Sequence, residues 1–350
     1  VALVGASERP GAIGRVVLEN IRAGGFIGAL HAVNPHHRRI FDAVSYATIA
    51  RIGQPVDLVV IATPAPRVHA IVDDAAAAGA KAAVLITAAP GGDPQHARTW
   101  TERIVAHAKS LGIRLVGAGA FGVIRTDIGL NATFSDVTAI KGRLALVSQS
   151  GAVCTAMLDF AAPMGIGFSS VVSLAEDGDV DVGELLDALV SDPATDGILM
   201  YIEAIADARR FMSALRAAAR VKPVVVLKAG RSLAPRGDEG APTPDEVFDV
   251  ALHRAGTLRV QTYTQLFAAA RALAMGRIPR GDRLAIVANG RGAALLAADR
   301  AFDLGMPLAT LSKATRERLD TLLPGESARG NPVDVRGYAT AADYAAALSA

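Results

Sequence analysis

Short apolar segments alternate with amphipathic stretches over the first 125 residues of the chain. The apolar segments have the length of buried strands, and the stretches between them place hydrophobic residues at helical spacing. We expect strands at 1–4, 29–33, 58–61, 82–86 and 114–116, and helices near 14–23, 67–78 and 95–111. This alternation is typical of a doubly wound parallel sheet, which binds ligands at the carboxyl ends of its strands.

The alternation resumes after a segment at 121–141 that we expect to be a linker. The second unit has expected strands at 144–147, 169–173, 197–202 and 224–227, and helices near 151–164, 182–190, 206–220 and 245–255. This pattern favours a flavodoxin-like sheet. A third unit begins with a strand at 284–287 and a helix that ends at 304, which gives too few strands to cover both faces of a parallel sheet. The predicted fold class is therefore α/β, with domains at 1–125, 141–276 and 281–350.

Composition narrows the classes of function. A net charge of +2 over 350 residues gives no general attraction to nucleic acid or to an acidic membrane. No uncharged apolar run approaches the roughly 20 residues that span a bilayer. The single cysteine, Cys154, cannot form an internal disulfide, so we expect a cytoplasmic protein in which this thiol is a small core residue. The acidic segment 173–181 lacks the spacing of a calcium loop, so we expect a solvated loop and helix start and no metal site.

A glycine-rich turn follows the first strand. The sequence Gly5-Ala-Ser-Glu-Arg-Pro-Gly11-Ala-Ile-Gly14-Arg15 leads into a helix, so its backbone N–H groups suit a pyrophosphate, although a tight connection without a ligand has the same pattern. A nicotinamide dinucleotide site would have closer glycines and an acidic residue after the second strand, but that strand ends in Asn34-Pro35. The next residues, His36-His-Arg-Arg39, suit a phosphate-rich ligand or a solvated basic turn.

Polar residues also follow the strands of the second unit. Ser148-Gln-Ser-Gly151 opens a helix, where free N–H groups and the Ser150 hydroxyl suit a phosphate or carboxylate. The alternative is that Ser150 is an ordinary N-cap. Glu203 ends another strand at the same edge of the sheet, and we expect its carboxylate to pair with Lys228 or Arg231.

Several segments resemble the NDP-forming acyl-CoA synthetases, relatives of the succinyl-CoA synthetase α subunit. They are Leu130-Asn-Ala-Thr-Phe134, Lys228-Ala-Gly-Arg-Ser232, Arg254-Ala-Gly-Thr-Leu-Arg-Val260, Asn289-Gly-Arg-Gly292 and Gly330-Asn-Pro-Val-Asp-Val335. The resemblance implies a Rossmann-like CoA-binding domain, then a flavodoxin-like domain of the succinyl-CoA synthetase type and the start of a second flavodoxin-like domain. The implied contacts to CoA or acetyl-CoA are Gly5, Ser7, Gly14, Arg15, Asn34, Pro35, Thr63, Pro64 and Thr87. Ser150 and Gly151 match the family's phosphate site, and Glu203 matches the glutamate that orients its phosphohistidine.

The chain departs from the family where phosphoryl transfer occurs. It has no Ser-His-Thr-Gly loop, Ala175-Glu176 replaces Gly-Asn, and Gly117-Ala-Gly119 replaces Gly-Pro-Asn. Of the histidines, only His253 falls in the second domain, and it lies near a predicted helix end, where a cation is favourable without catalysis. These departures resemble the synthetase-like half of bacterial protein lysine acetyltransferases, in which a GNAT domain is fused to a region without the histidine.

Three functions follow as hypotheses. The first is a CoA- or acetyl-CoA-binding regulatory region without ligase chemistry, in which ATP or ADP acts only through a domain outside this chain. Its expected partners are a GNAT or ATP-grasp domain, in the same polypeptide or another one, and self-association is compatible with it. The alternative is an active ADP-forming acyl-CoA synthetase of the acetate–CoA ligase type. A third, a nicotinamide-dependent dehydrogenase, rests on the amino-terminal turn alone. Because the chain begins inside an apolar strand and ends in a helical pattern, we expect a piece of a longer polypeptide.

Overall fold

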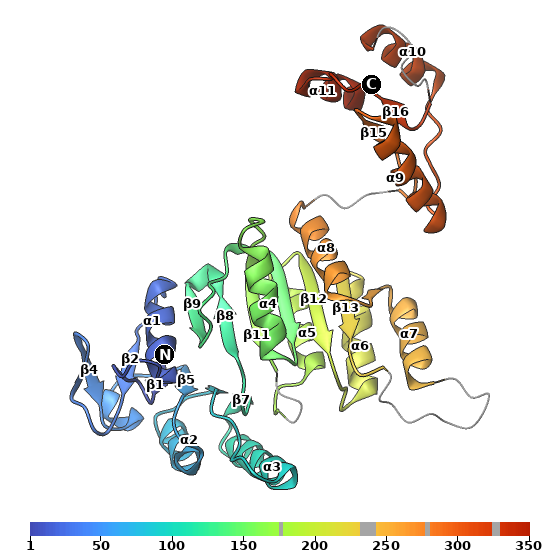
Figure 1. The fold of residues 1–350 in the computed structure, drawn as a ribbon. Helices are drawn as coiled ribbons and strands as arrows, with labels where there is room; N and C mark the ends of the chain where they lie inside the picture. The colour runs from blue at the N-terminus through green and yellow to red at the C-terminus, as the bar shows by residue number, and fades with distance from the viewer. Residues whose placement is uncertain (175–177, 232–242, 277–280, 324–329) are drawn as a thin grey trace. The chain divides into compact units, whose positions relative to one another are not determined.

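The computed structural model describes the chain except for residues 175–177, 232–242, 277–280 and 324–329. The chain divides into two compact units, Val1–Gly276 and Arg277–Ala350 (Figure 1). In the residues that the structure describes, the first unit contains two sheets of seven strands each, and the second contains a sheet of two strands. In the described part of the chain, no helix is both long enough and apolar enough to cross a membrane.

The first sheet has the strand order β3-β4-β2-β1-β5-β6-β7. Its strands are β1 (Ala2–Val4), β2 (His31–Val33), β3 (Arg39–Ile40), β4 (Ala43–Tyr46), β5 (Leu58–Ile61), β6 (Ala82–Leu85) and β7 (Arg114–Val116), and its helices are α1 (Ile13–Ala23), α2 (Val68–Ala77) and α3 (Pro94–Ser110). Strand β1 pairs in parallel with β2 on one side and β5 on the other, so Leu3 lies between Ala32 and Val60. The five predicted strands and three predicted helices are confirmed, and the β3–β4 hairpin was not foreseen.

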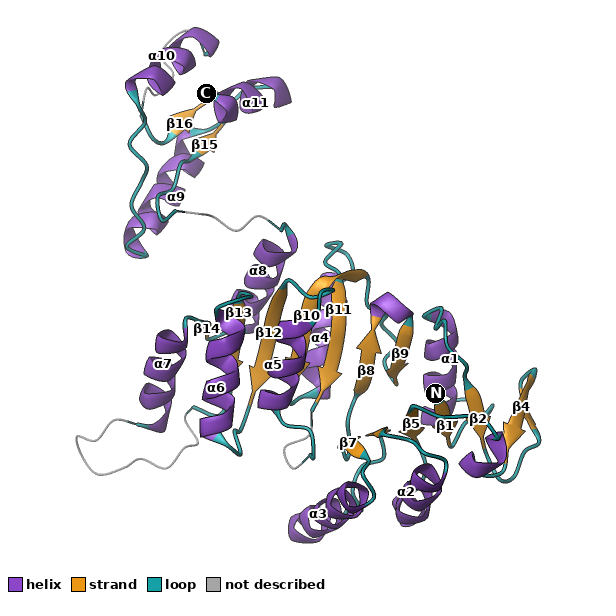
Figure 2. Cartoon of the chain, turned by 180° about the vertical axis from the view of Figure 1, so that it is seen from behind, coloured by secondary structure: helices purple, strands orange, loops and turns teal. Residues whose placement is uncertain are grey.

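The second sheet has the order β14-β13-β12-β10-β11-β8-β9. Its strands are β8 (Gly122–Arg125), β9 (Leu130–Thr133), β10 (Lys141–Ser148), β11 (Phe168–Ser173), β12 (Gly197–Ile202), β13 (Val224–Lys228) and β14 (Leu258–Val260). Its helices are α4 (Gly151–Ala161), α5 (Val182–Ser191), α6 (Ala208–Ala219), α7 (Pro244–Ala255) and α8 (Tyr263–Ala274). Because both faces are covered, consecutive residues in the central strands are buried: Leu146 packs towards α4 and α8, and Val147 towards α5, α6 and α7. Figure 2 shows α5 and α6 in front of this sheet.

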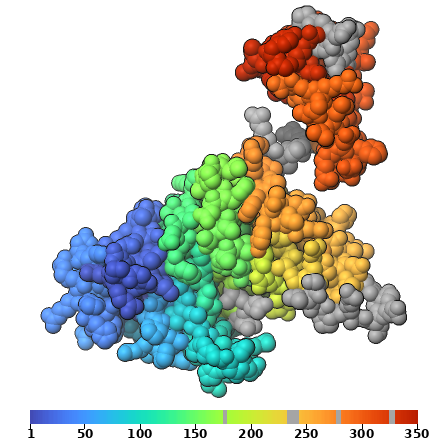
Figure 3. All heavy atoms as spheres, in the orientation of Figure 1, coloured from blue at the N-terminus to red at the C-terminus, as the bar shows by residue number. Residues whose placement is uncertain are grey.

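The expected linker at 121–141 is instead part of the second sheet, and that prediction was wrong. Strand β8 pairs antiparallel with both β11 and β9. Helix α1 of the first domain packs on β9, where the Asn20 side-chain amide donates to the carbonyl oxygens of Thr133 and Ser135, both at 2.8 Å. The blue first domain and the green strands of the second sheet are accordingly in continuous contact (Figure 3).

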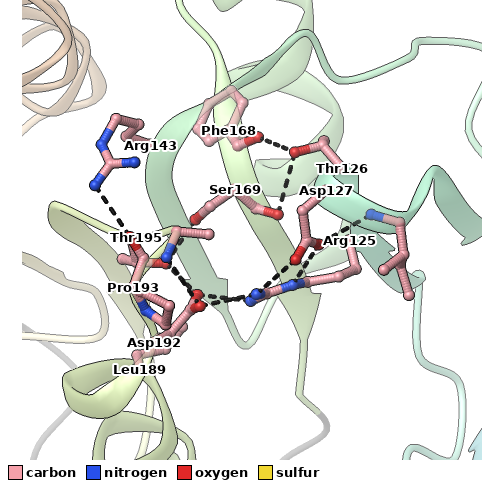
Figure 4. Close-up of polar contacts among 12 residues, drawn as sticks. Arg125, Thr126, Asp127, Arg143, Phe168, Ser169, Leu189, Asp192, Pro193 and Thr195 are labelled. Atoms are coloured by element: carbon pink, nitrogen blue, oxygen red, sulfur yellow. Dashed lines mark hydrogen bonds and ion pairs between the residues drawn. The ribbon is translucent and has the colours of Figure 1, made fainter.

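A polar network fixes β8 to the amino-terminal edge of the second sheet (Figure 4). The Arg125 guanidinium donates to both carboxylate oxygens of Asp192, at 2.6 and 2.8 Å. Asp192 also accepts from Thr195, whose hydroxyl lies 2.7 Å from that of buried Ser169 on β11. Charge-assisted fork contacts of this kind are among the stronger hydrogen bonds in proteins, so β8 is held by its side chain as well as by its ladder.

The second unit is built around a short parallel sheet. Strands β15 (Val287–Ala288) and β16 (Val333–Asp334) pair in parallel, with helices α9 (Arg291–Asp303), α10 (Lys313–Leu322) and α11 (Ala341–Ser349) around them. The predicted strand at 284–287 is shorter than expected, since Leu284 forms only a single bridge, to Leu308. The helix predicted to end at 304 is confirmed as α9.

Candidate functional site

The glycine-rich turn after β1 lies where the strand order of the first sheet reverses. Such switch points, at the carboxyl ends of the strands, leave a crevice for ligands. Gly5 has a φ of +94°, and a Cβ there would lie 2.4 Å from the carbonyl oxygen of Ala62. A Cβ on Gly14 would lie 1.9 Å from the carbonyl oxygen of Gly5. Both glycines are therefore needed for α1 and β5 to close on the turn.

Hydroxyl groups surround this turn. Thr63 Oγ1, just beyond β5, is buried and has no hydrogen-bond partner in the described part of the chain. Thr87, just beyond β6, donates from its hydroxyl to the carbonyl oxygen of Thr63 at 2.6 Å. The Ser7 hydroxyl accepts from the N–H of Arg9 at 3.1 Å and keeps its own proton for another partner. A buried, unpaired hydroxyl is unfavourable, so Thr63 fits a site whose occupant supplies an acceptor or donor.

Two polar side chains of the implied CoA site shape the turn itself. Arg15 donates to the carbonyl oxygen of Glu8 at 2.6 Å and pairs with Glu19 at 2.8 Å, and its guanidinium lies over the Phe41 ring. The Asn34 side chain donates to the carbonyl oxygen of Ala6 at 2.8 Å. It thereby joins the end of β2 to the turn after β1. The structure thus brings the nine implied residues to one edge, with exposed Pro35 and Pro64 at its rim.

A second switch point lies between β10 and β12 in the second sheet. Ser150 is the N-cap residue of α4, as the alternative interpretation expects, but its side chain makes no capping hydrogen bond. Within the described residues, the hydroxyl of Ser150 and the first N–H groups of α4 are available for an anion. Gly151 lacks a side chain where a Cβ would lie 3.0 Å from the Cβ of Phe121.

Gln149, which is not among the predicted site residues, ties the two strand ends together. Its side-chain oxygen accepts from the N–H groups of Glu203 and Ala204, at 2.6 and 3.1 Å. Its side-chain nitrogen donates to the carbonyl oxygen of Ala204 at 2.9 Å. The Gln149 amide carries its acceptor and its donors on separate atoms, so one side chain bonds both N–H groups and the carbonyl oxygen. The motif Ser148-Gln-Ser-Gly151 contained this residue, but its role depends on β12, more than 50 residues away.

The expected ion pair of Glu203 with Lys228 or Arg231 is absent among the described residues. The Lys228 ammonium instead donates to the carbonyl oxygen of Glu203 at 2.7 Å and to that of Ala229 at 2.5 Å. Burial is the main cause that lowers the pKa of Lys228. Burial and the neighbouring Glu203 carboxylate together raise the pKa of Tyr201, so this phenol stays neutral. Glu203 is thus left exposed beside a neutral hydroxyl.

The acidic segment after β11 is more than the solvated loop that its composition predicts. The Asp179 side chain is only 4% exposed, and its carboxylate accepts from Arg114 Nε at 2.6 Å. Arg114 begins β7 of the first domain and also pairs with Glu184 in α5. Asp181 caps α5 by accepting from the N–H of Glu184 at 2.7 Å, as the predicted helix start requires. The described residues contain no group of His, Cys, Asp and Glu side chains suited to a metal ion.

The other residues predicted for the catalytic edge either lie outside the described residues or lie elsewhere in the domain. Ala175-Glu176 and most of the loop after Arg231 lie outside the described residues. His253 lies in the last turn of α7, which leads to the start of β14 and therefore to the edge opposite Ser150. Cys154 is fully buried in α4, as predicted, and burial raises its thiol pKa to about 12.

Two family models match the two domains described above. Residues 1–126 match a CoA binding domain, and residues 141–273 match a succinyl-CoA ligase like flavodoxin domain. The fold and its two switch points therefore define a CoA ligase-like α/β protein. The chain belongs to the ADP-forming acyl-CoA synthetase family, in its α-subunit-like branch.

Individual relatives support this membership. The chain is 36% identical over 353 residues to ADP-forming acetate–CoA ligase I of Archaeoglobus fulgidus, covering 99% of this chain and 51% of the relative. It is 33% identical to the α subunit of ADP-forming acetate–CoA ligase I of Pyrococcus furiosus, covering 99% and 77%. A solved structure of dinucleotide-forming acetyl-coenzyme A synthetase 1 from Ca. Korarchaeum cryptofilum, in complex with phosphate and ADP, superposes with a TM-score of 0.91 at 31% identity, covering 99% and 76%.

The chain thus spans about half the length of the first of these relatives and about three quarters of the other two. The relatives named here are ligases or synthetases and give no support to a relation with GNAT-fused acetyltransferases.

Proposed function

We propose that this chain is the CoA-binding, α-subunit-like part of an ADP-forming acyl-CoA ligase. The observation that carries the proposal is the combination, in one compact unit, of a glycine cradle at one switch point and an uncapped helix start at the other. The first suits the pyrophosphate of CoA, and the second suits the phosphate or carboxylate of the acyl substrate. The ligase names of the relatives support the same assignment.

In this proposal the residues of the first domain divide into two groups. Gly5 and Gly14 allow the backbone to approach the pyrophosphate, while Arg15, Asn34 and Pro35 shape the turn around it. The hydroxyls of Ser7, Thr63 and Thr87, with Pro64 at the rim, line the cradle; Thr63 is the one whose buried oxygen lacks a partner among the described residues. CoA or acetyl-CoA is the expected ligand of this group.

In the second domain Ser150 and Gly151 would bind the anionic end of the acyl substrate. Glu203, on the adjacent strand end, would act on a proton or orient a group that reaches this edge. ATP or ADP would bind an ATP-grasp domain outside this chain, either in the same polypeptide or in a partner subunit. The α-subunit names of the relatives from Pyrococcus furiosus support such a division of labour.

A second candidate is a CoA-sensing region that has lost phosphoryl transfer. The observation that favours it is the segment 228–256, whose only histidine is His253, in the last turn of α7. A phosphohistidine mechanism needs an imidazole that can reach Ser150 and Glu203, at the opposite edge of the sheet. In this candidate CoA binding persists while thioester synthesis does not.

Calorimetric titration tests CoA binding, which both candidates require. We expect saturable binding of CoA and acetyl-CoA and none of NADH. Arg15→Ala should weaken CoA binding by about tenfold or more, since it releases the Glu8 carbonyl and loosens the turn. The matched control is Lys109→Ala, which removes a cation of the same domain from the far end of α3. Absence of CoA binding to the unaltered chain would overturn both candidates.

Synthesis of acetyl-CoA separates the two candidates. The complete protein, with its ATP-grasp domain or partner, is supplied with acetate, ATP and CoA, and thioester formation is measured. The ligase proposal expects acetyl-CoA and ADP as products. CoA binding without any thioester would instead establish the sensing region.

A further inference from the structure

A cavity of 520 Å³ lies at the carboxyl end of β13, away from the Ser150 helix start. Its floor is formed by Tyr201 at the end of β12 and Lys228 at the end of β13, and its rim by Arg231, Thr262 and Tyr263. The volume suits a small-molecule ligand. Since β12 lies between β10 and β13, this cavity and Ser150 are on opposite sides of Glu203.

The Lys228 ammonium is fixed in position within this cavity. Two of its three N–H donors are used by the carbonyl oxygens of Glu203 and Ala229. These neutral acceptors orient the ammonium without cancelling its charge, and one donor remains for a ligand. Gly230 has a φ of +75°, and a Cβ there would lie 3.9 Å from Lys228 Nζ, so this glycine is directly beside the ammonium.

The remaining lining favours an anion over a cation or a purely apolar ligand. Arg231 adds a second positive charge at the rim. The carboxylates of Asp245 and Glu203 lie near enough to act on Lys228, but Asp245 pairs with Arg259, and neither carboxylate forms an ion pair with Lys228 in the described part of the chain. The ring of Tyr201 lies 6.3 Å from that of Tyr263 and almost parallel to it, so the two phenols form one wall. The Tyr201 hydroxyl lies beside the Glu203 carboxylate, so the Tyr263 hydroxyl is the phenol that can donate to an oxyanion next to the two cations.

We propose that this cavity is a second oxyanion site, which binds a small phosphate or carboxylate through Lys228, Arg231 and the phenol wall. It goes beyond the proposed function, which places one anion at Ser150. With two anion sites flanking Glu203, the protein holds two negatively charged reactants at once, one on each side of β12. Phosphate and carboxylate share the chemistry that this site recognises, and the experiment below separates them.

The test uses protein labelled with ¹³C in the tyrosine rings, since the chain has only five tyrosines and two of them line the cavity. Inorganic phosphate and acetate are titrated separately, and the ring signals are assigned with Tyr201→Phe and Tyr263→Phe variants. We expect the Tyr201 and Tyr263 signals to shift saturably with at least one of the two ions. An ion bound only at Ser150 would leave the Tyr263 ring, at the far rim, unshifted.

The matched variants are Lys228→Met and Lys222→Met. Lys222 is also a partly buried lysine that donates to two carbonyl oxygens, those of Leu189 and Asp192, but it lies before β13, at the opposite edge. Lys228→Met should weaken the binding of the ion by about tenfold or more, and Lys222→Met should leave the affinity unchanged. Should Lys228→Met fail to fold, Arg231→Gln serves in its place, because Arg231 lies at the exposed rim.

Three results would overturn the proposal: unshifted Tyr201 and Tyr263 signals with both ions, unchanged affinity in Lys228→Met or Arg231→Gln, or an equal loss in Lys222→Met. CoA binding, measured by calorimetry on the same variants, should persist in all of them. The failure of this site would therefore be distinguishable from a failure of the proposed function.

Discussion

The Cα of Gly14 lies against the carbonyl oxygen of Gly5, so that a Cβ on Gly14 would stand only 1.9 Å from that oxygen. Both atoms belong to the backbone, so the clash could be relieved only by moving helix α1 or the turn after β1. Gly14→Ala should therefore destabilise the fold by about 3 kcal/mol and abolish CoA binding, because α1 would be pushed off the turn. Urea unfolding and CoA titration measure the two effects.

The control for this prediction is Gly91→Ala, in the same domain. A Cβ on Gly91 would meet no atom within 4 Å. This variant should keep the stability and the CoA affinity of the unaltered chain. Normal CoA binding by Gly14→Ala would contradict the role assigned to the glycine cradle.

The contact of Arg114 with Asp179 should matter more for stability than its surface position suggests. Arg114→Ala would leave a nearly buried carboxylate without its charged partner, which should cost about 2 kcal/mol. It should also increase amide hydrogen exchange in the first turn of α5, where Glu184 loses one of its two arginines. Arg143→Ala is the comparison, since its pair with Asp196 is exposed on both sides and should contribute little to stability. Equal effects of the two variants would contradict this difference.

The fork between Arg125 and Asp192 predicts a specific acid sensitivity. Hydrogen bonds from Arg125 hold the pKa of Asp192 well below its ordinary value of 3.8. Because the folded-state pKa is the lower one, the stabilisation is complete above the ordinary pKa and is lost as the pH falls below it. Urea unfolding between about pH 5 and pH 2 should show a shallower pH dependence for Asp192→Asn than for the unaltered chain. Identical slopes would show that Asp192 does not carry this linkage.

Cys154 should be chemically silent in the folded protein. Its side chain is fully buried, and burial raises the pKa of the thiol to about 12, so the reactive thiolate is scarce at neutral pH. We expect no reaction with Ellman's reagent until unfolding in guanidinium, and then one equivalent per chain, because this is the only cysteine. Rapid reaction of the folded chain would place Cys154 at an accessible position instead.

The sequence predicts the central parallel strands well because their signal is local. In β12 every residue of a continuous apolar run is buried, and β10 carries a similar run, so the run itself identifies the strand. Strands β8 and β9 give no such signal because they are short and contain polar residues. Asn131 is buried in β9 only because its side chain accepts from Thr133, two residues along the same strand. A segment with such polar residues therefore reads as a linker in the sequence, because only its pairing with β8 identifies it as a strand.

The residues of the candidate site likewise fall into those that a local motif predicts and those that depend on distant contacts. The glycine turn and the helix start at Ser150 were found because each is one short motif whose chemistry is local. The contacts of Gln149 with β12 and of Arg114 with Asp179 join residues more than 50 positions apart, so no periodicity indicates them. The sequence predicts an ion pair between Glu203 and a cation such as Lys228. In the structure the Lys228 ammonium instead donates to the backbone carbonyl oxygens of Glu203 and Ala229, and a sequence pattern does not indicate such contacts.

The placement of α1 on β9 also determines where this polypeptide can be divided. Leu130 and Ala132 of β9 complete the same core as Val17, Leu18 and Ile21 of α1, although they lie beyond residue 126, where the match to the CoA-binding model ends. A truncation at 126 would strip that core of its cover, and one that begins at 141 would remove two strands from the second sheet. The two domains are therefore not interchangeable modules: a chimera between relatives should keep its helix α1 and its strands β8 and β9 from a single parent.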